Sequence, residues 1–135
     1  MVPFDVETVV LCDDIRQEGN GKYLLIGVYG GNVVLRGFPT DLQLSLWILA
    51  RPRKLGKTQA KIRVVGPQDT ILAEGGLEVD VKDTAGALIM ALPGLPMQVQ
   101  REGKMRIELA SPTDDDWASI KTVDLVLAPT ASPKR

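Results

Sequence analysis

The stretch that decides the fold is LQLSLWI, residues 42–48. Alternate residues of an extended chain point to opposite faces. Four apolar side chains therefore share one face: Leu42, Leu44, Leu46 and Ile48. The opposite face carries Gln43, Ser45 and Trp47. This alternation predicts a central β-strand.

Upstream of residue 42 the pattern predicts a β-hairpin. A strand-forming run from Val6 to Cys12 leads toward Asn20-Gly21, a pair that accepts the positive φ angles of a tight turn. Tyr23 to Val28 then forms the return strand. Glycines follow, and they indicate a bend where the chain changes sheet before a strand over Asn32 to Arg36.

Downstream of residue 48 the same alternation recurs in residues 60–64, 77–81, 105–109 and 123–127. The run from Leu88 to Leu92 is almost entirely apolar, which predicts a strand buried on both faces. Between residues 111 and 119, Thr113 followed by three aspartates suits a helix N-terminus, so we expect one helical turn there.

These patterns predict an all-β, single-domain, antiparallel two-layer β-sandwich with at most one short helical turn. Eight or nine short strands with short connections favour antiparallel pairing, because a parallel sheet needs helical crossovers and no window has the 3.6-residue spacing of an amphipathic helix. The sandwich is predicted to span residues 1–128, and residues 129–135, with two prolines and a charged end, a flexible tail.

Composition limits which binding partners and which cellular compartment are expected. The 135 residues include 16 basic and 17 acidic side chains, so no global field attracts nucleic acid or an anionic membrane. A single cysteine indicates a reducing compartment, which predicts a cytoplasmic protein. No signal peptide is expected, because the N-terminus has no basic region and carries Asp5 and Glu7 before any apolar run. No membrane span is expected, because the most apolar stretch, Ala85 to Met97, is short and contains prolines.

The residue inventory argues against most catalysis. With no histidine, the serine and cysteine triads that depend on imidazole are excluded, and a zinc site lacks nearly all its usual ligands. Cys12 is expected to be a small buried apolar residue. A hydrolase that uses two carboxylates is not excluded. We expect no catalytic residues and no cofactor.

Three segments together resemble a family of small uncharacterised bacterial proteins predicted to be β-sandwiches. They are LCDDIRQEGNGKYLLIGVYGG (residues 11–31), GKMRIELA (residues 103–110) and the final VDLVLAP (residues 123–129). The resemblance implies a bacterial origin and an immunoglobulin-like or C2-like sandwich. It supplies no catalytic residue.

Two charged segments are candidate sites. The basic segment runs without an intervening acid and predicts one patch for an anionic ligand, such as a nucleotide, nucleic acid or lipid headgroup, or else a solvated edge strand. It comprises Arg51, Arg53, Lys54, Lys57, Lys61 and Arg63. The acidic loop of Asp114, Asp115 and Asp116 is a minor candidate for calcium, as in C2-type modules, or else a hydrated loop.

An apolar stretch from Ala85 to Met97 is a candidate interface, or else a buried strand with a loop packed over the core. The candidate interface residues are Trp47, Leu88, Met90, Leu95 and Met97. From these features we expect a non-catalytic interaction or assembly module with a protein partner or a second copy of itself. An anionic-ligand module is the alternative, with nucleic acid as the less favoured ligand.

Overall fold

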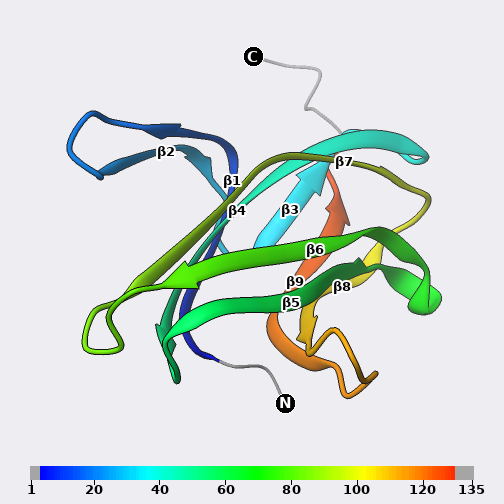
Figure 1. The fold of residues 1–135 in the computed structure, drawn as a ribbon. Coiled ribbons are helices and arrows are strands. Elements are labelled where there is room, and N and C mark those ends of the chain that lie inside the picture. The colour runs from blue at the N-terminus through cyan, green and yellow to red at the C-terminus, as the bar shows by residue number, and fades with distance from the viewer. Residues whose placement is uncertain (1–3, 130–135) are drawn as a thin grey trace.

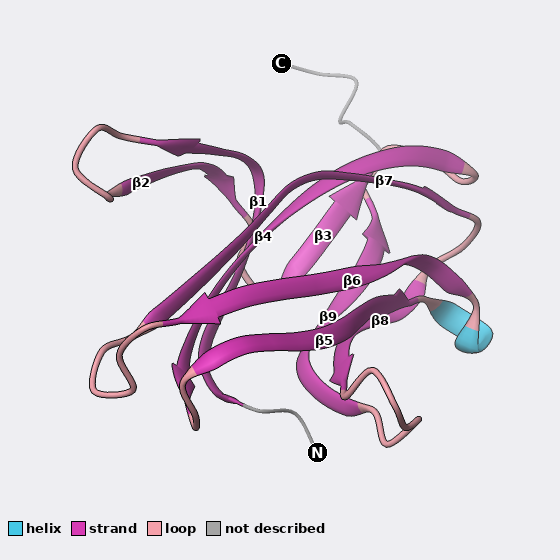
Figure 2. Ribbon diagram, in the orientation of Figure 1, coloured by secondary structure: helices cyan, strands magenta, loops and turns pink. Residues whose placement is uncertain are grey.

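The computed structural model describes residues 4–129 and confirms a single all-β domain of two packed sheets (Figures 1 and 2). The strands are β1 Phe4–Gln17, β2 Tyr23–Val28, β3 Asn32–Leu35, β4 Thr40–Pro52, β5 Gly56–Val65, β6 Ile71–Val81, β7 Leu88–Val99, β8 Gly103–Ala110 and β9 Ala118–Leu127. The one helical element in this range is the 3₁₀ turn η1, Pro67–Asp69. None of its helices is long and apolar enough to cross a bilayer.

The strands form a four-stranded sheet in the order β2-β1-β4-β7 and a five-stranded sheet in the order β3-β9-β8-β5-β6. Neighbouring strands are antiparallel, as expected, with one exception, since β3 pairs with β9 in parallel. Hairpin-linked neighbours must be antiparallel, but β3 and β9 are far apart in sequence, so no short loop fixes their direction. The pattern of alternation alone could not reveal this pair.

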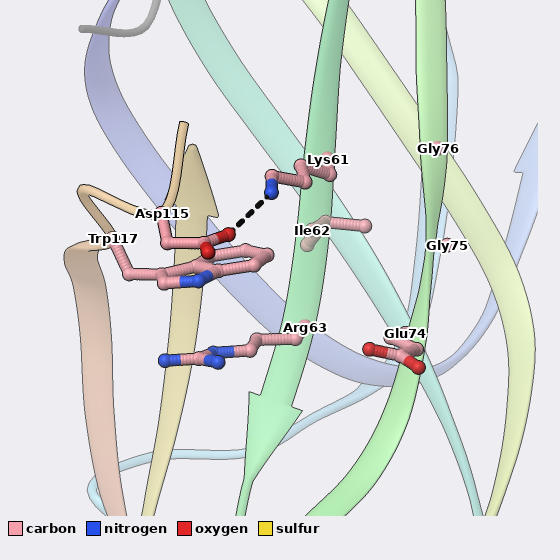
Figure 3. A pocket seen from close by; sticks show the side chains of 8 residues that line it. All are labelled: Lys61, Ile62, Arg63, Glu74, Gly75, Gly76, Asp115 and Trp117. Atoms are coloured by element: carbon pink, nitrogen blue, oxygen red, sulfur yellow. Dashed lines mark hydrogen bonds and ion pairs between the residues drawn. The ribbon is translucent and has the colours of Figure 1, made fainter. Parts of the chain in front are cut away.

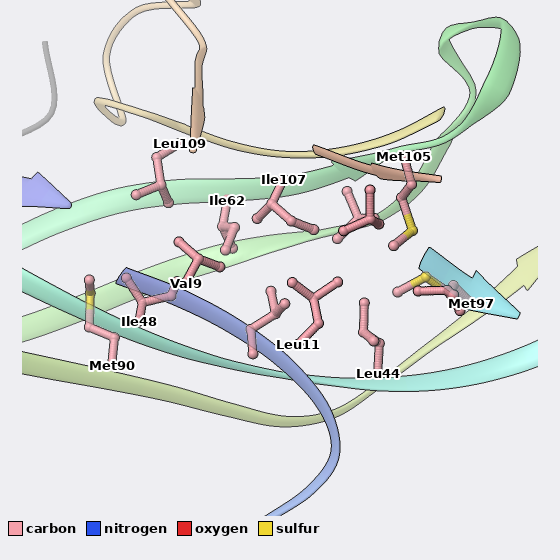
Figure 4. Packing of buried hydrophobic residues seen from close by; sticks show 14 of the residues in the cluster. Val9, Leu11, Leu44, Ile48, Ile62, Met90, Met97, Met105, Ile107 and Leu109 are labelled. Carbon is pink, nitrogen blue, oxygen red and sulfur yellow. The ribbon is translucent and has the colours of Figure 1, made fainter. Parts of the chain in front are cut away.

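The core lies between the sheets and is built by the predicted alternation. Leu44, Leu46 and Ile48 of β4 have no exposed surface. Figure 4 shows Leu44 and Ile48 in one cluster with Ile62 of β5 and Ile107 of β8 from the opposite sheet. The face predicted for LQLSLWI is therefore confirmed, and β4 is an interior strand between β1 and β7.

The helical turn expected near residue 113 is wrong. The loop there is non-helical, and the side chain of Asp114 accepts a hydrogen bond from the backbone N–H of Asp116 at 3.0 Å. Such local side-chain to backbone bonding competes with helix formation. The 3₁₀ turn lies instead at Pro67–Asp69, between β5 and β6.

The expectation that residues 88–92 are buried on both faces is also wrong. β7 is an edge of the four-stranded sheet, and Leu88 and Leu92 are only half-buried. The expected loop at Pro93 to Pro96 is part of the same strand, which continues to Val99. An edge strand tolerates proline because one side of it needs no backbone donor. Of the predicted tail, residues 130–135 lie outside the described residues.

Candidate interaction surfaces

The basic segment does not form one patch, because its members lie on different strands and four of them are ion-paired. Arg51 and Arg53 stand near the end of β4, beside Glu7 and Asp5 of β1. The guanidinium of Arg53 donates hydrogen bonds to Asp5 and holds the pKa of that carboxyl below its ordinary value. Both pairs are largely exposed and neutralise the cations locally.

Lys61 and Arg63 are on β5, and they flank the indole of Trp117, as Figure 3 shows. The Lys61 Nζ lies 5.1 Å and the Arg63 Cζ 4.1 Å from the ring centroid, both within cation–π range. Lys61 also forms an ion pair with Asp115 at 2.8 Å. Lys61 and Arg63 therefore share one face of β5, and the ring of Trp117 already contacts both cations.

Arg63 continues into a charge network on the same face. Its Nε donates to Glu108 of β8 at 2.7 Å, the second oxygen of Glu108 accepts from Arg106 at 3.1 Å, and Arg106 reaches Asp69 at 3.0 Å. Burial raises the pKa of Glu108, but the hydrogen bonds from the two arginines outweigh it, so the pKa lies below its ordinary value. This network is a satisfied structural element and leaves no spare cationic group.

A shallow cavity of about 740 Å³ lies next to this network. It forms where Gly75 and Gly76 of β6 leave no side chains. Its charged lining is balanced, because it contains two cations, Lys61 and Arg63, and two carboxylates, Glu74 and Asp115 (Figure 3). A balanced lining does not attract an anion by charge, so this cavity does not favour the anionic-ligand hypothesis.

Lys54 and Lys57 differ from the other cations of the segment. They line a second cavity of about 390 Å³ with Gln59, Glu78 and the loop at Pro112. No ion pair to either lysine is found within residues 4–129. They are the part of the basic segment that stays open to an anionic partner.

The acidic loop does not converge on one point. The Asp114 carboxylate accepts a hydrogen bond from the backbone N–H of Asp116, and this bond lowers the pKa of Asp114. Asp115 instead accepts a hydrogen bond from Lys61. Within residues 4–129 no group of three or more acidic or thiol side chains is placed to hold a metal ion. The loop's geometry is explained by these contacts without a cation.

The candidate apolar interface is mostly part of the core. Met90 and Met97 are buried, and they point between the sheets (Figure 4). Leu88 and Leu95 pack partly against the same cluster. Trp47 points to the other side of β4 and is half-buried, with the ring of Tyr23 6.5 Å away in an edge-on arrangement. These five residues therefore do not form a single exposed surface.

An exposed apolar surface that the sequence analysis did not predict lies on the hairpin of β1 and β2. This hairpin extends away from the body of the sandwich (Figure 1). Leu24, Ile26 and Val28 of β2 are 51%, 41% and 57% exposed. A signal was present in the sequence, since YLLIGV, residues 23–28, has no charged residue on either face of the predicted strand.

The bend of the hairpin is built at Gly27. Its φ of +69° is a left-handed conformation, and the carboxylate of Asp13 occupies the space that a Cβ would need. The other oxygen of Asp13 accepts a hydrogen bond from the Tyr29 hydroxyl at 2.8 Å. Burial, followed by this bond, raises the pKa of Tyr29 to about 12. The contacts of Asp13 therefore hold the base of the hairpin in this bend.

Cys12 lies next to Asp13 at this bend and is fully buried. Burial and the nearby charge of Asp13 raise the pKa of its thiol, so it stays protonated and unreactive at neutral pH. Nearby, Ser45 of β4 donates to the carbonyl of Asp13 and accepts from the Gly94 N–H. The expectation that Cys12 packs as a small buried residue is confirmed.

Comparison with known proteins adds no identification. No protein-family model matches the sequence, and no curated protein matches it significantly. The resemblance to uncharacterised bacterial β-sandwich proteins stays a prediction.

Proposed function

We propose that this chain is a non-catalytic protein-interaction module of the bacterial cytoplasm, and that it binds its partner through strand β2. The observation that carries the proposal is the uncovered apolar edge of the hairpin. Leu24, Ile26 and Val28 are exposed on a strand whose outer side has no neighbour in the described sheets. Such an edge can accept a strand from another chain.

The other edges of the two sheets are protected in ways that β2 is not. β7 contains Pro93 and Pro96, β3 has only four residues, and β6 carries acidic side chains such as Glu74 and Glu78. Prolines, charges and short length are the usual means of preventing unwanted strand pairing. β2 has none of the three, which supports a role in pairing.

The proposal is tested by affinity capture from the native host with matched variants. Ile26→Lys places a charge on the β2 edge, and Leu55→Lys places the same charge on an equally apolar residue, 62% exposed, in the turn between β4 and β5. Because a lysine on the edge disfavours strand pairing, we expect a partner retained by the wild type and by Leu55→Lys to be lost with Ile26→Lys.

Circular dichroism and the melting temperature must show that all three proteins are folded alike. The proposal is wrong if the folded Ile26→Lys protein retains the same partners as the wild type. It is equally wrong if both lysine variants lose the partner to the same extent, because the loss would then reflect charge rather than position.

A further inference from the structure

The tip of the β1–β2 hairpin places an asparagine directly before a glycine in an open loop. The loop is formed by residues 19–21, and it is closed by the Glu18 N–H, which donates to the Lys22 carbonyl at 2.7 Å. Its last residue, Gly21, has a φ of +77°, as in three-residue hairpin loops that end in a left-handed residue. Asn20 and Gly21 are both exposed, so the asparagine amide and the next backbone nitrogen face solvent together.

Neither of these two groups is held or covered by a neighbour. Within residues 4–129 the Asn20 side chain and the Gly21 N–H form no hydrogen bond. Even a Cβ at Gly21 would meet no heavy atom within 4 Å, and glycine has no Cβ to crowd its own nitrogen. Figure 1 shows the loop at the far end of the hairpin, away from the other strands. The Gly21 nitrogen is therefore free to approach the Asn20 side chain.

We propose that Asn20 is a site of deamidation, a reaction of the thermolabile asparagine amide that needs only water. The Gly21 nitrogen attacks Cγ of Asn20, the Cγ–Nδ2 bond breaks, and the amide leaves as ammonia with the proton of the Gly21 nitrogen. Water then opens the cyclic succinimide. Opening at Cγ gives aspartate, and opening at the backbone carbonyl gives isoaspartate. This inference is independent of the proposed use of β2 as an interaction edge.

The other asparagine of the chain, Asn32, is an internal comparison. It is also exposed, but it lies in β3 and is paired with Asp124 of β9. The residue that follows it is Val33, a β-branched residue whose side chain is fully buried. Because the strand fixes the backbone and the valine crowds its own nitrogen, we expect Asn32 to keep its amide.

Isoaspartate would change the shape of the loop as well as its charge. Its main chain passes through Cγ, which adds a carbon atom to the backbone of the loop. The bond between the Glu18 N–H and the Lys22 carbonyl closes the loop at its present length, so a longer backbone disfavours this bond. We therefore expect faster amide hydrogen exchange in residues 17–23 of the deamidated protein.

The test is incubation of the folded, full-length protein in mildly alkaline buffer, followed by peptide mapping with mass spectrometry. Alkali is used because the Gly21 nitrogen must lose its proton to attack. We expect Asn20 to be converted to a mixture of aspartate and isoaspartate while Asn32 is unchanged. Asn20→Gln should abolish the reaction at the loop, because its longer side chain disfavours ring closure, and Asn32→Gln should leave that reaction as it is in the wild type.

The same incubation in urea separates the folded loop from the sequence alone. Conversion of Asn20 in the folded protein as well as in urea supports the proposal. Conversion in urea only refutes it, because the folded loop would then protect the amide, and so does conversion of Asn32 as fast as that of Asn20.

Asn20→Asp is the matched control for hydrogen exchange, because it carries the new charge on an ordinary backbone. Faster exchange in residues 17–23 of the incubated wild type than in Asn20→Asp supports the expected loosening of the loop by isoaspartate. Equal exchange in the two proteins overturns it.

Discussion

At the scale of single residues, Glu108 is the side chain whose chemistry differs most from its sequence context. The alternation in residues 104–110 puts Glu108 on the face opposite Met105 and Ile107, and the structure buries it there between Arg63 and Arg106. Sequence alternation gives the face correctly. It cannot show that two arginines, one of them on a neighbouring strand, converge on this carboxylate, because that depends on pairing of β5 with β8.

Glu108→Gln tests this network through the dependence of stability on pH. The pKa of Glu108 is lower in the folded protein than in the unfolded chain. The ionised carboxylate therefore stabilises the fold at any pH above the ordinary glutamate pKa, and this stabilisation is lost as the pH falls through the folded-state pKa. At neutral pH we expect the variant to be less stable by about 1–3 kcal/mol. Urea unfolding from pH 7 to pH 3 should show the gap between variant and wild type narrowing on acidification. A difference in stability that is constant with pH would contradict this account.

Glu18→Gln, in the exposed hairpin turn, is the control for removing a glutamate charge outside this network.

At the scale of elements, the β1–β2 hairpin shows what the sequence could and could not predict. The Asn20-Gly21 turn and the return strand at Tyr23–Val28 are confirmed, because turn chemistry and β-propensity are local. The sequence did not reveal that β1 extends to Gln17 or that the hairpin leaves the sandwich. Both depend on the bend at Gly27 and on the packing of Tyr23 against Trp47.

Gly27→Ala should disrupt this bend. An alanine there must adopt a left-handed conformation, which costs about 1–2 kcal/mol, and its methyl group must displace the Asp13 carboxylate. We expect a lower melting temperature and faster amide hydrogen exchange in residues 13–28. Gly19→Ala, in the same hairpin with open space around it and no such φ constraint, should change little. Equal effects of the two substitutions would show that Gly27 and its contact with Asp13 do not hold the bend in place.

At the scale of the whole molecule, the sandwich is a single core shared by both sheets. The apolar faces of the strands were predictable from their period of two, but the strand order was not, because pairing partners such as β5 and β8 are distant in sequence. For the same reason the basic segment was expected to be one patch, although its cations are divided between the two sheets.

Ile107→Ala measures how much this shared core stabilises the fold. Ile107 has no exposed surface and lies in β8, an interior strand of the five-stranded sheet (Figure 4). Truncating such a residue leaves a cavity, so we expect a loss of about 2–5 kcal/mol in the free energy of unfolding, measured with urea. Leu55→Ala, in an exposed turn, should change it by less than about 0.5 kcal/mol. A small effect at Ile107 would mean that the two sheets are not packed as described.

The parallel pair of β3 and β9 has a consequence for synthesis of the chain on the ribosome. β3 is complete by residue 35, but β9, its one strand neighbour within residues 4–129, ends at Leu127. The five-stranded sheet therefore cannot close until almost the whole described chain has emerged. Until then the nascent chain carries β3 without a partner and the hairpin edge uncovered, which is the state in which chaperones bind nascent chains. The five-stranded sheet can therefore be completed only once β9 has left the ribosome.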